Sequence, residues 1–151
     1  MERIGEMSEL KHLLRYSIKE AIFYDALAVR IDNGEYKTGI ARYSHLRNEH
    51  ILSLHFFLLQ TGAQNISTGL PALYNDCSLD HLIESVETFD DRSIRKLCFS
   101  VARHTIKMYK RLLMATHNSN QRLANLLRRH LYAIKRLKSS GLLSGGHLKI
   151  S

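Results

Sequence analysis

The apolar residues of this chain recur at spacings of three and four along stretches that contain no proline. The one proline, Pro71, lies between two such stretches. In the first stretch Leu10, Leu14, Ala21 and Tyr24 follow this spacing, which places their side chains on one face of an α-helix. No segment shows the two-residue alternation of a β-strand. The sequence therefore predicts an all-α fold.

Turn residues divide these stretches into helices. Asn33-Gly34 is a typical helix end, and Ser8 and Ser119 are candidate N-caps. The connection at Asn33-Gly34 is short, so we expect the first two helices to be antiparallel neighbours. The predicted helices cover residues 8–32, 35–61, 79–88, 91–116 and 120–139, in one domain over 1–139 with a flexible tail over 140–151.

The same spacing predicts which side chains of the three later long helices are buried. The second helix is expected to bury Ile40, Tyr43, Arg47, His50, Leu54 and Phe57. The third is expected to bury Ile94, Leu97, Val101, either His104 or Thr105, Met108 and Leu112. The fourth is expected to bury Leu123, either Leu126 or Leu127, either His130 or Leu131, Ile134 and Leu137.

The charge is divided unevenly along the chain. The net charge is +8, yet residues 92–151 contain no Asp or Glu, so all 14 acidic residues lie in 1–91. One interpretation is a surface for nucleic acid or for an acidic partner. The other is that the basic half packs against the acidic half or neutralises it.

The remaining composition indicates a cytoplasmic protein. Cys77 and Cys98 form no CxxC pair, which fits a reduced environment, and Cys98 reads as an inert core residue. The N-terminal residues lack the apolar core of a signal peptide. No apolar run approaches the roughly 20 residues that span a bilayer, so no membrane partner is expected.

Two hairpins joined by a long connection resemble the ferritin-like superfamily, particularly its small rubrerythrin-like bacterial proteins of unknown function. Glu20 on the first helix and Glu49 on the second carry the resemblance. It implies a four-helix bundle in which the connection, with its short extra helix, crosses the bundle so that the second and third long helices run parallel. In that family, inward Glu and Glu-x-x-His side chains hold two metal ions.

This chain departs from the family's ligand pattern. Leu52 stands where the second helix would carry His, and the last two helices hold no carboxylate after Asp91. The polar residues of these helices that we expect to face inward are Arg103, His104, Arg128, Arg129 and His130. Two carboxylates cannot offset two hard cations, so no metal, cofactor or catalytic residue is expected.

Two alternatives remain open for the inward polar residues. Glu20 is expected to pair with Arg47 or Arg103 as a buried ion pair in place of a metal. Alternatively, the vestigial ligands Glu20, Glu49, His50 and His104 hold a single iron, manganese or zinc ion in an oxidoreductase. Without any metal, His50 and His104 would be core histidines hydrogen-bonded to a carboxylate, or they would lie at the surface. The sequence contains no nucleotide-binding or hydrolase motif.

The fourth helix is strongly basic. Its charges form two neighbouring stripes, which consist of Arg122, Arg129 and Arg136, and of Arg128 and Lys135. Such stripes could contact phosphates without reading bases, or they could simply be a solvated face. We therefore expect a non-catalytic, metal-free binding or structural module. The short helix over 79–88 and the apolar Phe56-Phe57 region could offer a second packing surface, so a homodimer is also expected.

Overall fold

A computed structural model describes residues 2–32, 34–61 and 90–139. Within these ranges the chain forms four long helices and no strand, which confirms the all-α prediction. The helices are α1 (Glu2–Arg30), α2 (Gly34–Gln60), α5 (Asp91–Thr116) and α6 (Gln121–Ser139). The expected short helix over 79–88 and the tail over 140–151 lie outside the described residues. No described helix is long and apolar enough to cross a membrane.

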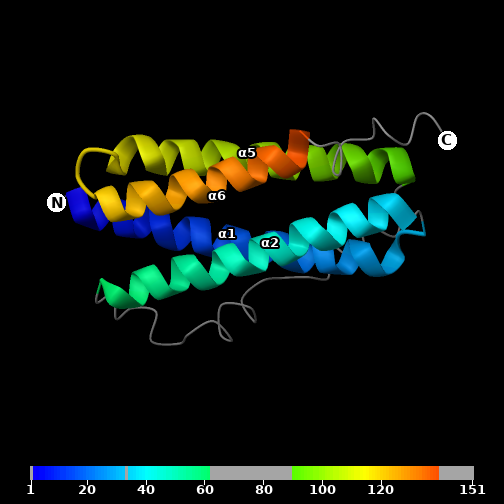
Figure 1. Cartoon of the computed structure of the whole chain (residues 1–151), viewed down its shortest axis with the longest axis horizontal. Helices are drawn as coiled ribbons and strands as arrows, with labels where there is room; N and C mark the ends of the chain where they lie inside the picture. The colour runs from blue at the N-terminus through cyan, green and yellow to red at the C-terminus, as the bar shows by residue number, and fades with distance from the viewer. Residues whose placement is uncertain (1, 33, 62–89, 140–151) are drawn as a thin grey trace.

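The helices form two antiparallel hairpins (Figure 1). One hairpin consists of α1 and α2, and the other consists of α5 and α6. The hairpins pack together with α1 against α5 and α2 against α6. In this arrangement α2 and α5 run in the same direction (Figure 1). Every helix thus contributes one face to a shared centre.

Helix α1 begins at Glu2, six residues before the expected start, so Ser8 lies inside the helix and is no N-cap. The first turns dock onto the other hairpin, because buried Glu6 accepts a hydrogen bond from the hydroxyl of Ser119. Ser119 was expected to cap α6. Asn120 caps it instead, with Oδ1 accepting from the backbone N–H of Leu123 at 3.1 Å.

Helix α5 has a side-chain cap at the residue before it begins. The carboxylate of Asp90 accepts a hydrogen bond from the backbone N–H of Ser93 at 2.8 Å. This bond satisfies one of the amide groups that the first turn leaves unpaired. It also lowers the pKa of the Asp90 carboxyl.

The buried faces follow the predicted spacing most closely on α2. All six expected residues of this helix are buried. On α5 the buried face is turned by about one residue from the predicted one, so that Cys98, Ala102, Thr105 and Tyr109 are buried. The expected Leu97, Val101 and Met108 are only partly buried. On α6 the buried residues are Leu123, Ala124, Leu127, His130, Leu131 and Ile134.

Candidate functional site

The centre of the bundle is occupied by a buried arginine. Arg47 comes from the middle of α2, and its side chain is 0% exposed. Its Nε donates to Oε1 of Glu20 on α1 at 2.9 Å, and the Glu20 side chain is also 0% exposed. Of the two partners that were predicted for Glu20, Arg47 is therefore the one that it contacts. Arg103, the other candidate, is exposed on α5.

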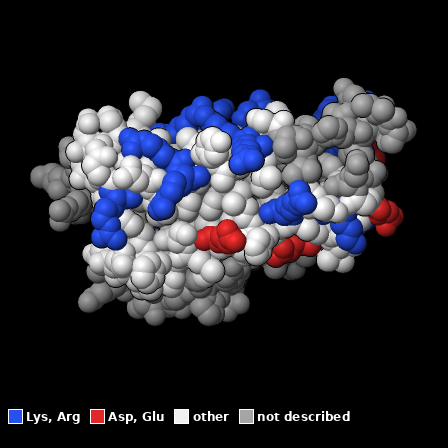
Figure 2. Space-filling model, viewed as in Figure 1, with Lys and Arg blue, Asp and Glu red and all other residues white. Residues whose placement is uncertain are grey.

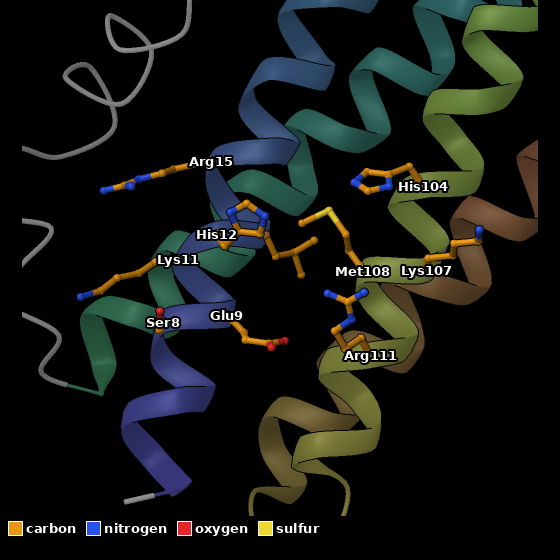
Figure 3. Close-up of a pocket in the computed structure, with 10 residues that line it drawn as sticks. Ser8, Glu9, Lys11, His12, Arg15, His104, Lys107, Met108 and Arg111 are labelled. Carbon is orange, nitrogen blue, oxygen red and sulfur yellow. The ribbon is translucent and has the colours of Figure 1, made fainter.

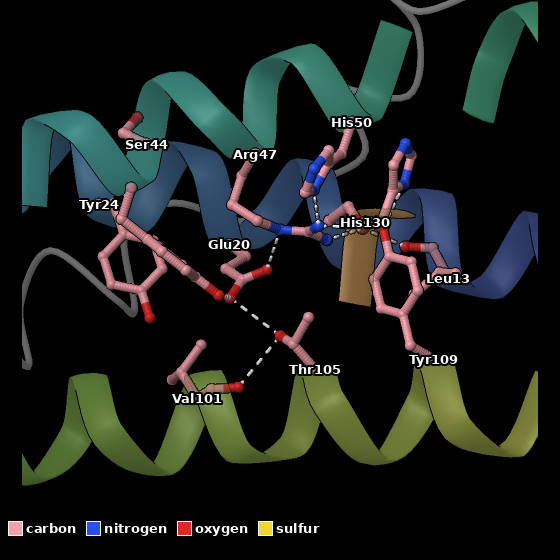
Figure 4. Close-up of polar contacts among 12 residues, drawn as sticks. Leu13, Glu20, Tyr24, Ser44, Arg47, His50, Val101, Thr105, Tyr109 and His130 are labelled. Carbon is pink, nitrogen blue, oxygen red and sulfur yellow. Dashed lines mark hydrogen bonds and ion pairs between the residues drawn. The ribbon is translucent and has the colours of Figure 1, made fainter. Parts of the chain in front are cut away.

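The second oxygen of Glu20 is bound by two other helices (Figure 4). Oε2 accepts hydrogen bonds from the hydroxyl of Tyr43 on α2 at 3.0 Å and from that of Thr105 on α5 at 2.9 Å. With Arg47, three donors surround the carboxylate. A buried charge is tolerated when it is paired and hydrogen-bonded in this way. Glu20 thereby joins α1, α2 and α5.

The other nitrogens of Arg47 extend the network toward α6. Nη2 donates to the hydroxyl of Ser17, while Nη1 lies 2.6 Å from Nδ1 of His50 and 3.0 Å from the hydroxyl of Tyr109. The Tyr109 hydroxyl is in turn 3.0 Å from Nδ1 of His130. No buried polar atom of this described network lacks a hydrogen-bond partner.

The hydrogen-bond donors of this network indicate which ring nitrogen of His50 and of His130 carries the proton. Arginine can only donate, so Nδ1 of His50 accepts and its proton sits on Nε2. The Tyr109 hydroxyl accepts from Arg47, which leaves its own proton for Nδ1 of His130. The two imidazoles stack, with ring centroids 3.8 Å apart and planes inclined by 15°. Both rings are therefore neutral.

The electrostatics agree with this assignment. Burial opposes the charge of Arg47, but Tyr109 and Glu20 raise the pKa of its guanidinium above the usual value. Burial and the positive charge of Arg47 lower the pKa of His50. The same two causes lower the pKa of His130 to about 3. Burial also raises the pKa of the Tyr109 hydroxyl.

The four metal-ligand candidates are not brought together. Glu20 and His50 lie in the centre, but Arg47 bonds to both. Glu49 is exposed and pairs with Nε2 of His45 at 3.1 Å. His104 is exposed and packs edge-on against Tyr16, 4.9 Å between ring centroids. Among the described residues no group of three His, Cys, Asp or Glu side chains is placed to hold a metal ion, and a buried guanidinium repels one. The residues present do not fit the family's metal site.

The expected inward positions of the second hairpin were also partly wrong. Arg103, Arg128 and Arg129 are exposed, and only His130 faces the centre. Tyr109 was not among the expected buried residues. Its position four after Thr105 was the signal that could have found it, because residues four apart share a helix face.

A second candidate site lies on the surface of α5 and α6. Arg103, Lys107 and Lys110 of α5 line a hollow of about 370 Å³ with Lys135 and Lys138 of α6. Figure 2 shows lysine and arginine side chains gathered over these two helices, whereas the acidic side chains in the middle of the view lie toward α2. We call these five cations the basic face.

A neighbouring hollow of about 560 Å³ continues this charge toward α1. Lys107 and Arg111 of α5 line it together with His12 of α1. Glu9 is the acidic residue among the described residues of the lining, and its carboxylate points toward Arg111 across the gap (Figure 3). The charge of this hollow is therefore partly offset, unlike that of the basic face.

The predicted basic stripes of α6 are exposed but face two directions. Lys135 belongs to the basic face. The other side of the helix, toward α2, carries Arg122, Arg128 and Arg129 beside a third hollow. Arg136 is exposed. The sequence stripes thus supply two surfaces.

Comparisons of this chain with protein-family models, with curated protein sequences and with solved structures give no match. The functional argument therefore rests on the geometry of the two sites.

Proposed function

We propose that this chain is a non-catalytic, ferritin-like bundle whose basic face binds a phosphate-rich polyanion such as duplex nucleic acid. The observation that carries the proposal is the hollow in which five lysine and arginine side chains converge, with no acidic side chain among the described residues of its lining. Phosphate groups are the usual partners of such a surface.

The buried network supports the non-catalytic part of the proposal. Arg47 occupies the position between Glu20 and His50 where the family's metal would need space. The shared direction of α2 and α5 supports the ferritin-like part, because a long crossover connection produces that arrangement.

Backbone contact without base reading is the expected mode of binding. The basic face comprises flexible lysines and one arginine on the sides of two long helices. It offers few planar side chains that could pair with base edges. Affinity should therefore depend strongly on salt and little on sequence.

Fluorescence anisotropy with labelled duplex DNA tests the proposal. We expect binding at low salt that weakens as salt rises, with equal affinity for two unrelated sequences. The triple variant Lys107→Glu, Lys110→Glu, Lys135→Glu should reduce the magnitude of the log–log salt slope by about 2–3, because each lost phosphate contact contributes about 0.9.

The matched control carries the same charge change on the other hairpin. Lys19, Lys37 and Arg42 are exposed on α1 and α2, and Lys19→Glu, Lys37→Glu, Arg42→Glu should leave most of the slope in place. Equal losses in the two triple variants would assign binding to net charge alone and overturn the proposal. Absence of binding by the unmodified chain at low salt would overturn it as well.

A further inference from the structure

Three large apolar side chains form an exposed stripe on α2. Leu52, Phe56 and Leu59 follow at spacings of four and three, and they are 61%, 62% and 53% exposed. Residues at this spacing share one helix face. The remaining large exposed apolar residues of the described chain, Val29, Met114 and Tyr132, lie on three other helices. The stripe is thus the one place where exposed apolar side chains follow each other along a described helix.

A groove runs beside this stripe, between α2 and α6. It has a volume of about 760 Å³ and includes Phe56, Phe57 and Leu126 as apolar lining. Phe57 is buried and supports the groove, whereas Phe56 is exposed. The Phe56-Phe57 region therefore offers one exposed aromatic ring rather than two.

Three arginines of α6 line the same groove, and its lining holds no acidic residue within the part of the chain that the structure describes. Arg122 donates to Oε1 of Gln60 at 3.0 Å, and its guanidinium lies 6.0 Å from the ring centroid of Phe57. Arg128 donates to Oδ1 of Asn125 at 3.0 Å. Both bonds go to neutral amides, so they leave the positive charge of these arginines uncompensated.

We infer that this groove binds an acidic amphipathic helix of a partner protein. Phe56, Phe57 and Leu126 give the groove an apolar lining on which the apolar face of an amphipathic helix can pack. Arginine guanidinium groups match carboxylates in charge and geometry. The groove lies between the antiparallel helices α2 and α6, which suits a rod-shaped ligand. A nucleic acid would leave the apolar lining of the groove without a partner.

A synthetic peptide provides the direct test. We would use a labelled, acidic peptide of about 18 residues, roughly 27 Å long as a helix, with leucines at spacings of three and four and glutamates elsewhere. A peptide of the same composition with scattered leucines, and one with lysine in place of glutamate, serve as ligand controls. Only the first should bind in a saturable manner.

Variants of the protein locate the binding. Phe56→Ser and Arg129→Glu should each weaken binding at least about tenfold, the size expected for a central interface residue. Val29→Ser and Arg42→Glu introduce the same two residue types at exposed positions of α1 and α2 outside the groove and should leave binding unchanged. Equal binding of the scattered peptide, or insensitivity to both groove variants, would overturn the inference.

Further measurements separate this inference from competing occupants and from the proposed function. The Lys107→Glu, Lys110→Glu, Lys135→Glu variant should retain peptide binding, because these residues lie outside the groove. Loss of peptide binding in that variant would place the peptide on the basic face and overturn the groove assignment. Light scattering that shows a dimer dissociated by Phe56→Ser would identify a second copy as the occupant, again against the inference. Phe56-dependent binding to anionic vesicles in place of the peptide would also contradict it.

Discussion

Arg47 and Glu20 form an ion pair between α2 and α1 in which neither side chain is exposed to solvent. The Nε–Oε1 distance is 2.9 Å, and the remaining bonds of both groups go to hydroxyls and one imidazole. The pair therefore stands at the point where the four helices meet. Each charge is stabilised by the other, because water reaches neither side chain.

Removing one member of this pair should destabilise the fold strongly. Glu20→Gln leaves the Arg47 charge buried without a counter-ion, and Arg47→Met does the same to the carboxylate. We expect each change to lower the free energy of unfolding by about 3–5 kcal/mol. Urea unfolding followed by far-ultraviolet circular dichroism measures this.

The double variant distinguishes an ion pair from simple packing. Glu20→Gln with Arg47→Met removes both charges, so its cost should be smaller than the sum of the single costs by at least about 2 kcal/mol. Additive costs would contradict the assignment of a charge pair. The double variant also provides a folded protein if a single variant does not fold.

The hydrogen bond from Thr105 to Glu20 should contribute measurably by itself. Thr105→Val keeps the shape of the side chain but removes a donor to a buried carboxylate, so we expect a loss of about 2 kcal/mol. Thr38 makes a hydroxyl contact to the carbonyl of Gly34 on an exposed turn of α2. Thr38→Val should cost no more than about 0.5 kcal/mol, and a similar loss in both variants would argue against a buried network.

Stability should fall as the pH drops below 6.5. The pKa of His130 is lowered to about 3 in the folded chain, whereas an unfolded histidine titrates near 6.5. Between these values the unfolded state binds a proton that the folded state does not, so acidification favours unfolding. His130 alone should account for about 2 kcal/mol between pH 7 and pH 5.

The variant His130→Asn tests this assignment, because the amide oxygen can replace Nδ1 as acceptor for Tyr109. Between pH 7 and pH 5 the free energy of unfolding of this variant should fall by about 2 kcal/mol less than that of the unmodified chain. His12 is exposed on α1, and His12→Asn should leave the pH profile of the unmodified chain unchanged. A profile unaffected by His130→Asn would show that the central histidine does not titrate as described.

The ion pair was predictable from the sequence because the chemistry leaves few choices. Glu20 lies on the apolar face of its helix, and a buried carboxylate needs a cation. Arg47 occupies the equivalent face of the antiparallel neighbour. On α2 the six expected residues follow one another at spacings of three and four, and all six are buried.

The α5 face was harder to predict because a buried helix face is broad enough to admit adjacent residues. His104 and Thr105 are both compatible with the spacing, and only packing against α1 and α2 selects Thr105 through Glu20. For the same reason the spacing predicted that Met108 is buried and did not indicate Tyr109, the residue after it. The stacking of His50 on His130 joins residues 80 positions apart on different helices, so no local pattern indicates it.

Cys98 offers a way to detect opening of the bundle. Its thiol is buried, and burial raises the pKa to about 12, so almost no thiolate exists at neutral pH. Its carbonyl accepts a hydrogen bond from the Tyr24 hydroxyl at 3.2 Å, which ties this part of α5 to α1.

In a Cys77→Ser background, where Cys98 is the single thiol, a disulfide reagent should react slowly with native protein and rapidly in denaturant. Because modification requires opening, adding Glu20→Gln should accelerate it, and the logarithm of the rate should rise in proportion to the lost free energy of unfolding. Fast modification of the native protein without that change would contradict the buried position of the thiol.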